Sequence, residues 1–479
     1  MPTSTMILLW LAFVLVVANT QAPTKCYGIM FDAGSSGTRI YVYNWPCRTK
    51  TSTPKVYVAD DAPNFQVRPG ISSFASNTSG VGPSMDKLLE FASTIVPANQ
   101  KSFTPIFLRA TAGMRLLTIE QQTDILNAIR TYFRNSGYRF DSDSWARVIT
   151  GDEEGAFGWV AVNYLYNNID LKTPPSATNT VLDCGGASVQ LTFSQPAKTD
   201  PNNFYDVAFQ DIRSYTLYTH SYLGYGNDQA RKGVAKLFDT STGTIVSPCF
   251  NTGFNNTNVL PDELKGVRVV GSGNYTQCRQ LIREYMRLND SCTLCSIQGN
   301  YQPAIPSTSV INGLNAYVFL ADTLKVGEYY TLDKLGAVSD HFCNLTWTDA
   351  QASFKSDFLS TTCFQASLLV EMTMNGFKVA PSSVITARRF IGNSSVAWTL
   401  GAILYDISTS NCKEGTELCF GSNIDNWYPV VYVVPIVVVV FIVVSLVVII
   451  SIVLYVRRKK RLQAASYTEQ VDMNYHVMK

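Results

Sequence analysis

Residues 29–42 read IMFDAGSSGTRIYV, and residues 180–193 read TVLDCGGASVQLTF. In each stretch an apolar run ends at an aspartate, a turn of small residues follows, and apolar alternation resumes. Asp32 matches Asp183 when the two stretches are aligned without a gap. The pattern predicts two β-hairpins of one design, each with a turn too small for bulky side chains. This internal repeat indicates an α/β chain with two related halves.

The composition of the two turns suits a phosphate group. Glycine and serine let backbone N–H groups approach phosphate oxygens closely, successive N–H groups form an anion-binding concavity, and serine hydroxyls add donors. An aspartate at the strand end would repel phosphate, but it can hold a bridging divalent cation through water. One such hairpin could be an ordinary glycine-rich turn with a surface aspartate. Two copies in the same register favour a pair of hairpins that clamp a phosphate chain from two lobes.

An acidic segment lies between the two hairpins in the sequence. GDEEGAFGW, residues 151–159, follows a strand-like stretch and opens a helical pattern. Carboxylates at a helix N-terminus are expected from capping alone, because they favour the positive end of the helix dipole. Capping accounts for Asp152 and Glu153. Glu154, which glycine follows, is the candidate general base, because a carboxylate within reach of an attacking water can take its proton.

A fourth segment, FLRATAGMRLL at residues 107–117, passes from a strand through a small turn into a helix. A phosphate could rest there on Thr111 and on neighbouring backbone N–H groups. An ordinary tight strand–helix junction with a surface arginine is the alternative.

Length and composition bound the class of protein. The chain has 479 residues, which suits two lobes and an anchor, and 46% of them are hydrophobic, which is enough for large cores. The net charge is only +2, and no Lys/Arg tract alternates with aromatic residues. These features disfavour a nucleic-acid partner.

Two apolar segments predict the membrane topology. Residues 1–22 are interpreted as a signal peptide, because the apolar run is too short for a bilayer core of about 30 Å; an uncleaved anchor is the alternative. Residues 430–456 carry no charge and are long enough to span a membrane, and basic residues open the tail at 457–479. The chain is therefore predicted to be a single-pass type I membrane protein with its bulk extracellular or lumenal. A buried core helix is the alternative for residues 430–456.

Glycosylation sequons and cysteines agree with an oxidising compartment. Cys292 and Cys295 could instead bind zinc, but with three histidines in the chain and no second C-x-x-C this is disfavoured. Cys184 is left over and is interpreted as a small buried hydrophobe. The sequons begin at Asn77, Asn255, Asn274, Asn289, Asn344 and Asn393, and pairing of neighbouring cysteines suggests the disulfides Cys26–Cys47, Cys249–Cys278, Cys292–Cys295, Cys343–Cys363 and Cys412–Cys419.

Taken in order, these segments resemble the signature regions of the ecto-nucleoside triphosphate diphosphohydrolase (apyrase) family. The resemblance implies an α/β, actin-like (ribonuclease-H-like) fold of two lobes with a nucleotide cleft between them. Lobe I would comprise residues 23–150 with 395–426, and lobe II residues 151–394. The disulfides of the segment 249–363 also look like family bridges. The matching stretches are DAGSSGTR at 32–39, ATAGMRLL at 110–117, GDEEGAFGW at 151–159, LDCGGASVQ at 182–190 and AWTLG at 397–401.

The resemblance also implies a role for each matching residue. Glu154 matches the general base, Ser188 and Gln190 match residues that hold the attacking water, and Asp32 and Asp183 match the carboxylates that organise a Ca²⁺ or Mg²⁺ shell. Tyr317 is a candidate for stacking on the base, with a core aromatic as the alternative. The candidate phosphate-binding residues are Ser35, Ser36, Gly37, Thr38, Arg39, Thr111, Gly185, Gly186, Ala187 and Ser188.

The implied activity is metal-dependent hydrolysis of nucleoside tri- and diphosphates to monophosphates, with water attacking the terminal phosphorus. The alternatives are a nucleoside diphosphatase of a secretory-pathway membrane, another actin-like enzyme such as an exopolyphosphatase or a sugar kinase, and an inactive actin-like glycoprotein receptor. The joint presence of the candidate base, water-holding and metal residues argues against an inactive receptor. In the tail, Tyr475–Met478 fits the pattern of an endocytic sorting signal, for which a plain solvated tail is the alternative.

Overall fold

The computed structural model describes residues 25–46, 57–58, 65–195, 198, 203–209, 212–260, 264, 266–288, 292–392, 394–409, 444–446 and 448–460. Of these, residues 25–409 belong to one compact unit and residues 444–460 to another. The predicted signal peptide, most of the predicted span at 430–456, and the sorting motif Tyr475–Met478 lie outside the described residues. Residues 444–446 and 448–460 are helical. No helix in the described part of the chain has the length and apolarity that crossing a bilayer demands.

The first sheet of the larger unit carries the first predicted hairpin. β1 (Lys25–Ala33) and β2 (Thr38–Pro46) are antiparallel, as predicted. β5 (Ile106–Ala110) lies parallel to β1, and β6 (Ala146–Val148) lies parallel to β5. The short strands β3 (Tyr57–Val58) and β4 (Phe65–Val67) pair with the outer edge of β2.

The second sheet repeats this arrangement around the second predicted hairpin. β7 (Thr180–Cys184) and β8 (Ser188–Ser194) are antiparallel, again as predicted. β14 (Ile311–Asn315) lies parallel to β7, and β16 (Val384–Thr386) lies parallel to β14. The repeat in the sequence is therefore a repeat of sheet topology. The remaining strands of this sheet are β9 (Phe204–Ala208), β10 (Ser214–Leu223) and β15 (Tyr329–Thr331).

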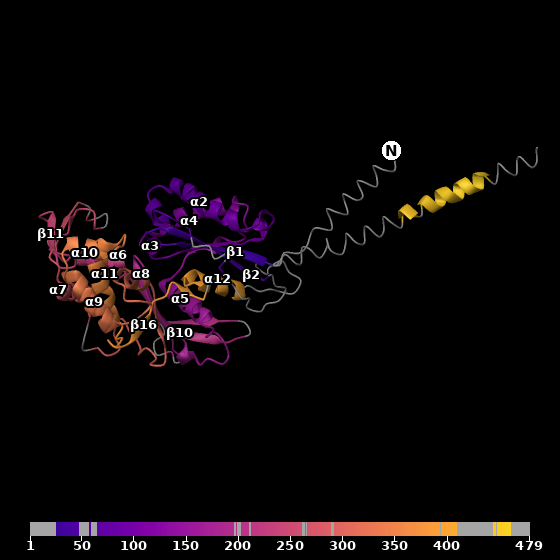
Figure 1. Cartoon of the computed structure of the whole chain (residues 1–479). Coiled ribbons are helices and arrows are strands. Elements are labelled where there is room, and N and C mark those ends of the chain that lie inside the picture. The colour runs from indigo at the N-terminus through magenta and orange to yellow at the C-terminus, as the bar shows by residue number, and fades with distance from the viewer. Residues whose placement is uncertain are drawn as a thin grey trace, which may run out of the picture. The chain divides into compact units, whose positions relative to one another are not determined.

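Helices cover both faces of both sheets in layers (Figure 1). α2 (Val81–Ile95) and α4 (Ile119–Arg134) cover the outer face of the first sheet. α5 (Gly151–Leu165) and α12 (Trp398–Thr409) lie between the two sheets. The outer face of the second sheet is covered by α6 (Asn227–Ala235), α7 (Tyr275–Met286), α8 (Ala316–Leu324), α9 (Leu332–Asn344), α10 (Trp347–Ser353) and α11 (Thr362–Glu371).

Smaller elements complete the unit. β11 (Thr244–Ser247), β13 (Arg268–Gly271) and β12 (Asn255–Asn256) form a three-stranded sheet, and β17 (Phe390–Ile391) pairs with β18 (Ser394–Ser395). The one-turn helix α3 (Ala112–Arg115) follows β5 directly.

The two central helices pack at unusually close range. A Cβ on Gly401 of α12 would lie 1.9 Å from the carbonyl oxygen of Phe157 in α5, so only glycine fits there. The AWTLG stretch thus has a packing reason for its glycine. α5 is buried along most of its length, including all of 154–163, because sheets or helices contact it on every side.

The structure contains three of the predicted disulfides: Cys249–Cys278, Cys292–Cys295 and Cys343–Cys363. Cys26 is also disulfide-bonded, but its predicted partner Cys47 lies outside the described residues, as do Cys412 and Cys419. Among the sequons, Asn77, Asn255 and Asn344 are exposed and Asn274 is half-buried, whereas Asn289 and Asn393 lie outside the described residues. Glycosylation and the lobe boundaries stay predictions.

Candidate active site

The two hairpin turns close with the same backbone hydrogen bond. In the first turn Gly34 N donates to Gly37 O at 3.0 Å, and in the second Gly185 N donates to Ser188 O at 3.0 Å. Each turn therefore follows the same path from the end of its first strand to the start of its second. The match between the two sequence stretches extends to individual hydrogen bonds.

The three segments expected to bind phosphate, namely the two hairpin turns and the segment 107–117, meet at Ser35 of the first turn. A Cβ on Gly186 of the second turn would lie 2.9 Å from Ser35 Oγ, and a Cβ on Gly113 would lie 2.6 Å from Ser35 Cα. Thr111 N donates to Ala33 O at 3.2 Å, which joins the segment 107–117 to the first hairpin. Small residues are required here because the three backbones approach one another so closely. The first turn thus lies against both of the other segments.

Two buried carboxylates stand at the strand ends next to these turns. Asp32 Oδ2 lies 3.4 Å from Arg39 Nη1, and Asp183 Oδ1 accepts a hydrogen bond of 2.5 Å from Asn315 Nδ2. Burial raises the pKa of Asp32, and it raises the pKa of Asp183 to about 6, with repulsion from Asp32 adding to the shift. Desolvated carboxylates that repel each other are stabilised by a divalent cation between them.

The donor set therefore fits a hard cation such as Ca²⁺ or Mg²⁺, which prefers oxygen ligands and keeps waters of its own. Within the described ranges no group of three or more His, Cys, Asp or Glu side chains forms a ready-made metal cage. Two aspartates with water completing the shell agree with that observation. The alternative that Cys292 and Cys295 bind zinc is wrong, because these two residues form a disulfide.

Glu154 lies at the centre of a polar cluster. Its Oε2 is 2.9 Å from Arg115 Nη2 and 3.3 Å from Gln190 Nε2, and Gln190 Nε2 is also 2.8 Å from Ser188 Oγ. Burial raises the pKa of Glu154 to about 7; Arg115 opposes the shift, and repulsion from the two aspartates adds to it. The structure thus brings together the three residues expected to activate and hold a water. A carboxyl group with a pKa near neutrality suits general-base chemistry.

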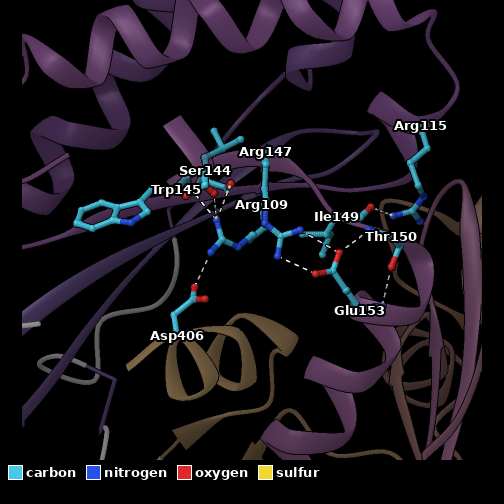
Figure 2. A network of polar contacts seen from close by, with 10 residues as sticks. Arg109, Arg115, Ser144, Trp145, Arg147, Ile149, Thr150, Glu153 and Asp406 are labelled. Carbon is cyan, nitrogen blue, oxygen red and sulfur yellow. Dashed lines mark hydrogen bonds and ion pairs between the residues drawn. The ribbon is translucent and has the colours of Figure 1, made fainter. Parts of the chain in front are cut away.

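The neighbouring glutamate has a different environment. Both oxygens of Glu153 face Arg147, at 2.7 and 2.9 Å, and Glu153 Oε2 also accepts from Thr150 N at 2.9 Å (Figure 2). Thr150 Oγ1 accepts from Glu153 N in return, which completes a capping box at the start of α5. Capping therefore explains Glu153, as predicted, and leaves Glu154 free of that task.

Three polar residues that contact the candidate site residues were not themselves predicted as site residues. Arg115 contacts both Glu154 and Ser188, Asn315 donates to Asp183, and Ser221 Oγ lies 2.9 Å from Gln190 Nε2. Arg115 stands within a matching stretch, but its side-chain direction depends on packing. Asn315 has a left-handed φ of 52°, which no sequence pattern announces.

The side-chain placement does not support two expected contacts, that of Tyr317 with the nucleotide base and that of the Thr38 hydroxyl with phosphate. Tyr317 is fully buried, and its hydroxyl lies 2.8 Å from Thr373 Oγ1, so its ring offers no face to a nucleotide base and the stacking prediction is corrected to a core aromatic. Thr38 is also fully buried, and its hydroxyl has no hydrogen-bond partner among the residues that the structure covers. Ser36, another candidate phosphate ligand, is exposed. Cys184 forms no disulfide and is buried, as interpreted from the sequence, and burial raises the pKa of its thiol.

The whole length of the described unit matches known proteins. The sequence model of the GDA1/CD39 (nucleoside phosphatase) family matches residues 18–418. Ectonucleoside triphosphate diphosphohydrolase 1 of Mus musculus is 32% identical over 445 residues, which cover 84% of this chain and 85% of the relative. Probable apyrase 3 of Arabidopsis thaliana is 30% identical over 413 residues, which cover 80% of this chain and 83% of the relative.

A solved structure shares the fold. The crystal structure of nucleoside triphosphate hydrolases from Neospora caninum superposes with a TM-score of 0.60 at 16% identity and covers 84% of this chain and 96% of that chain. At this identity the likeness concerns the fold alone. The match to the family model and the relatives carries the assignment: the chain belongs to the GDA1/CD39 family of nucleoside phosphatases.

Proposed function

We propose that this chain is an apyrase, which hydrolyses nucleoside tri- and diphosphates to monophosphates and releases one phosphate at a time. One observation carries the proposal. Ser188 and Gln190, which cluster with Glu154, belong to the second hairpin, and the turn of that hairpin meets Ser35 of the first. A candidate base and two candidate phosphate turns thereby share one site. The names of the curated relatives, triphosphate diphosphohydrolase and apyrase, agree with this chemistry.

The fold that we propose is the actin-like pair of ribonuclease-H-like lobes, with the nucleotide between them. Lobe I would hold residues 23–150 with 395–426, and lobe II residues 151–394. The repeated order of antiparallel hairpin and parallel strands in the two sheets supports two related lobes. The contact between the two hairpin turns supports a phosphate chain gripped from both sides.

In the proposed mechanism Ser188 and Gln190 hold a water beside Glu154. The water oxygen forms a bond to the terminal phosphorus as the bond from that phosphorus to the bridging oxygen breaks, and the carboxylate of Glu154 takes the proton. Positioning supplies most of the rate gain in phosphoryl transfer. No covalent intermediate is needed.

The phosphate chain would be bound by the backbone N–H groups and hydroxyls of the three converging segments. Asp32 and Asp183 would hold a Ca²⁺ or Mg²⁺ ion, largely through water. When bound, such an ion neutralises negative charge on the phosphates. The phosphate contacts that we propose are Ser35, Ser36, Gly37, Thr38 through its backbone, Arg39, Thr111, Gly185, Gly186, Ala187 and Ser188.

We also propose that the catalytic unit faces the extracellular or lumenal side of a membrane as part of a single-pass type I protein. The sequons and the observed disulfides suit an oxidising compartment. The apolar run at 430–456 and the basic residues after it support the orientation. A sorting adaptor that recognises Tyr475–Met478 remains part of this proposal.

Two other functions fit parts of the molecule. A nucleoside diphosphatase of a secretory-pathway membrane would use the same site, and it differs in substrate rank and location. An inactive receptor would need no assembled base, yet Gln190 Nε2 lies within hydrogen-bonding distance of both Glu154 and Ser188. The site therefore favours an enzyme.

The test uses the full-length chain in membranes from expressing cells. Released phosphate is measured with ATP, ADP, UTP, UDP and GDP, with and without EDTA. Glu154→Gln keeps the size of the side chain and should lower phosphate release by about 10²–10⁴-fold. Phosphate release by the variant at the wild-type rate would remove Glu154 as the base, and no metal-dependent release by wild type would refute the apyrase proposal. Release from diphosphates alone would favour the diphosphatase.

A further inference from the structure

Arg115 is the one cation that contacts two of the three residues in the proposed water-activating cluster, as far as the described residues go. Its Nη2 lies 2.9 Å from Glu154 Oε2 and 3.3 Å from Ser188 Oγ, and its Nη1 lies 3.1 Å from Ile149 O. Its side chain is only 15% exposed. Three protein acceptors thus fix the plane of one guanidinium group, which a planar, pre-organised fork suits well.

These contacts join parts of the fold that are distant in sequence. Arg115 is the last residue of the short helix α3, which begins directly after Thr111. Ser188 begins β8 of the second sheet, and Glu154 lies in the first turn of α5 between the sheets. One side chain therefore spans the base, a water-holding residue and the segment that meets the first hairpin.

A second arginine, Arg147 of β6, contacts a glutamate in the same first turn of α5 and can be compared with Arg115. Arg147 holds Glu153 through two contacts of 2.7 and 2.9 Å (Figure 2). Arg115 holds Glu154 through one contact of 2.9 Å. Both pairs are partly buried; one ties the start of α5 to β6 of the first sheet, and the other ties it to α3. Within the part of the chain that the structure describes, neither Glu153 nor Arg147 contacts Ser188 or Gln190. If arginines served only to anchor α5, the two would be equivalent.

We propose that Arg115 is a positioning residue that holds Glu154 and Ser188 in the geometry required to activate water. This inference rests on the proposed function and adds a role that the capping of α5 does not require. Because its Nη2 hydrogens are directed at Glu154 and Ser188, Arg115 acts on the attacking water through them and not by binding the phosphate. Its loss should therefore lower kcat and leave KM nearly unchanged.

The experiment compares four full-length proteins: wild type, Arg115→Ala, Arg115→Lys and Arg147→Ala. We measure kcat and KM for ATP and ADP with saturating Mg²⁺, and thermal stability in parallel. For Arg115→Ala we expect kcat to fall by about 10²-fold, as displaced catalytic groups typically cause, with KM within a few-fold of wild type. For Arg147→Ala we expect a lower melting temperature but kcat within a few-fold of wild type.

Two further measurements keep the inference testable if Arg115→Ala folds poorly. Arg115→Lys retains the charge, but an ammonium group lacks the planar fork, so its kcat should fall at least 10-fold. Guanidinium ion, at concentrations well below those that unfold proteins, should raise the kcat of Arg115→Ala and not that of Arg147→Ala.

Each remaining outcome would count against the inference. Equal losses of kcat in the two alanine variants would make Arg115 a structural anchor. A raised KM with unchanged kcat would make it a phosphate ligand, and a fully active Arg115→Lys would remove the need for the fork. An inactive wild-type enzyme would overturn the apyrase proposal and this inference together, whereas an active wild type with any of the former results would overturn the inference alone.

Discussion

Removal of divalent cations should destabilise the catalytic unit, and more strongly at pH 8 than at pH 5. Glu154 and Asp183 are buried, and burial raises the pKa of Glu154 to about 7 and that of Asp183 to about 6. In the unfolded chain both groups would titrate near their ordinary values of about 4. At pH values between the unfolded-state and folded-state pKa values, the folded protein binds more protons than the unfolded chain. Its stability without a cation therefore falls as the pH rises through this range.

The size of the effect follows from the shifts. A carboxyl group whose pKa rises by roughly 2 units costs about 3 kcal/mol when it must ionise in the folded state. The costs of Glu154 and Asp183 do not add, because part of each shift comes from repulsion within the same carboxylate cluster. We therefore expect a net loss of a few kcal/mol between pH 5 and pH 8. For a unit of this size that loss corresponds to a decrease of about 5 °C in melting temperature.

The assay is thermal unfolding, followed by tryptophan fluorescence in EDTA and in excess Ca²⁺ or Mg²⁺ at both pH values. Ions should raise the melting temperature by several degrees at pH 8 and by little at pH 5, where the carboxyl groups are protonated. Asp183→Asn should shrink the difference, whereas Asp322→Asn, which removes an exposed carboxylate, should not. An ion effect of equal size at both pH values, or a larger one at pH 5, would refute the reasoning.

Three further predictions concern packing around the site. Gly113→Ala should lower kcat several-fold, measured by phosphate release, because its Cβ would lie 2.6 Å from the first hairpin turn. Arg109→Met should lower the free energy of unfolding by about 3 kcal/mol in urea titrations, because it breaks a buried 2.6 Å ion pair with Asp406 (Figure 2). Tyr317→Phe should cost about 1 kcal/mol of stability and leave KM values for ATP, GTP and UTP unchanged, since its hydroxyl bond is internal.

The parts of the site that the sequence predicts are those set by local chemistry. Both hairpins follow from apolar alternation and small-residue turns, which need no distant partner. The capping box at Thr150 and Glu153 depends only on residues three apart, and it separates Glu153 from Glu154 before any packing is known. A gapless match between two hairpins also predicts that their turns share a function.

The parts that the sequence does not predict depend on side-chain direction. Tyr317 and its neighbours form an apolar helix, α8, in which every position could face the core or the ligand until the sheet beneath is placed. Arg115 and Asn315 contact residues far along the chain. Basic and amide side chains at the end of a helix or a strand are common, so their type alone does not distinguish a site residue from a surface residue.

The position of the base follows from the layers. α5 lies between two sheets, so apolar residues occur all round it and both sheets fix its axis. Only its first turn leaves this apolar environment, and a helix N-terminus tolerates carboxylates. Helix α3, which follows β5 of the first sheet, supplies Arg115 there, and the second sheet supplies Ser188 and Gln190. A base placed at this turn keeps a fixed relation to phosphate held by both hairpins, which a base on either outer helical layer could not do.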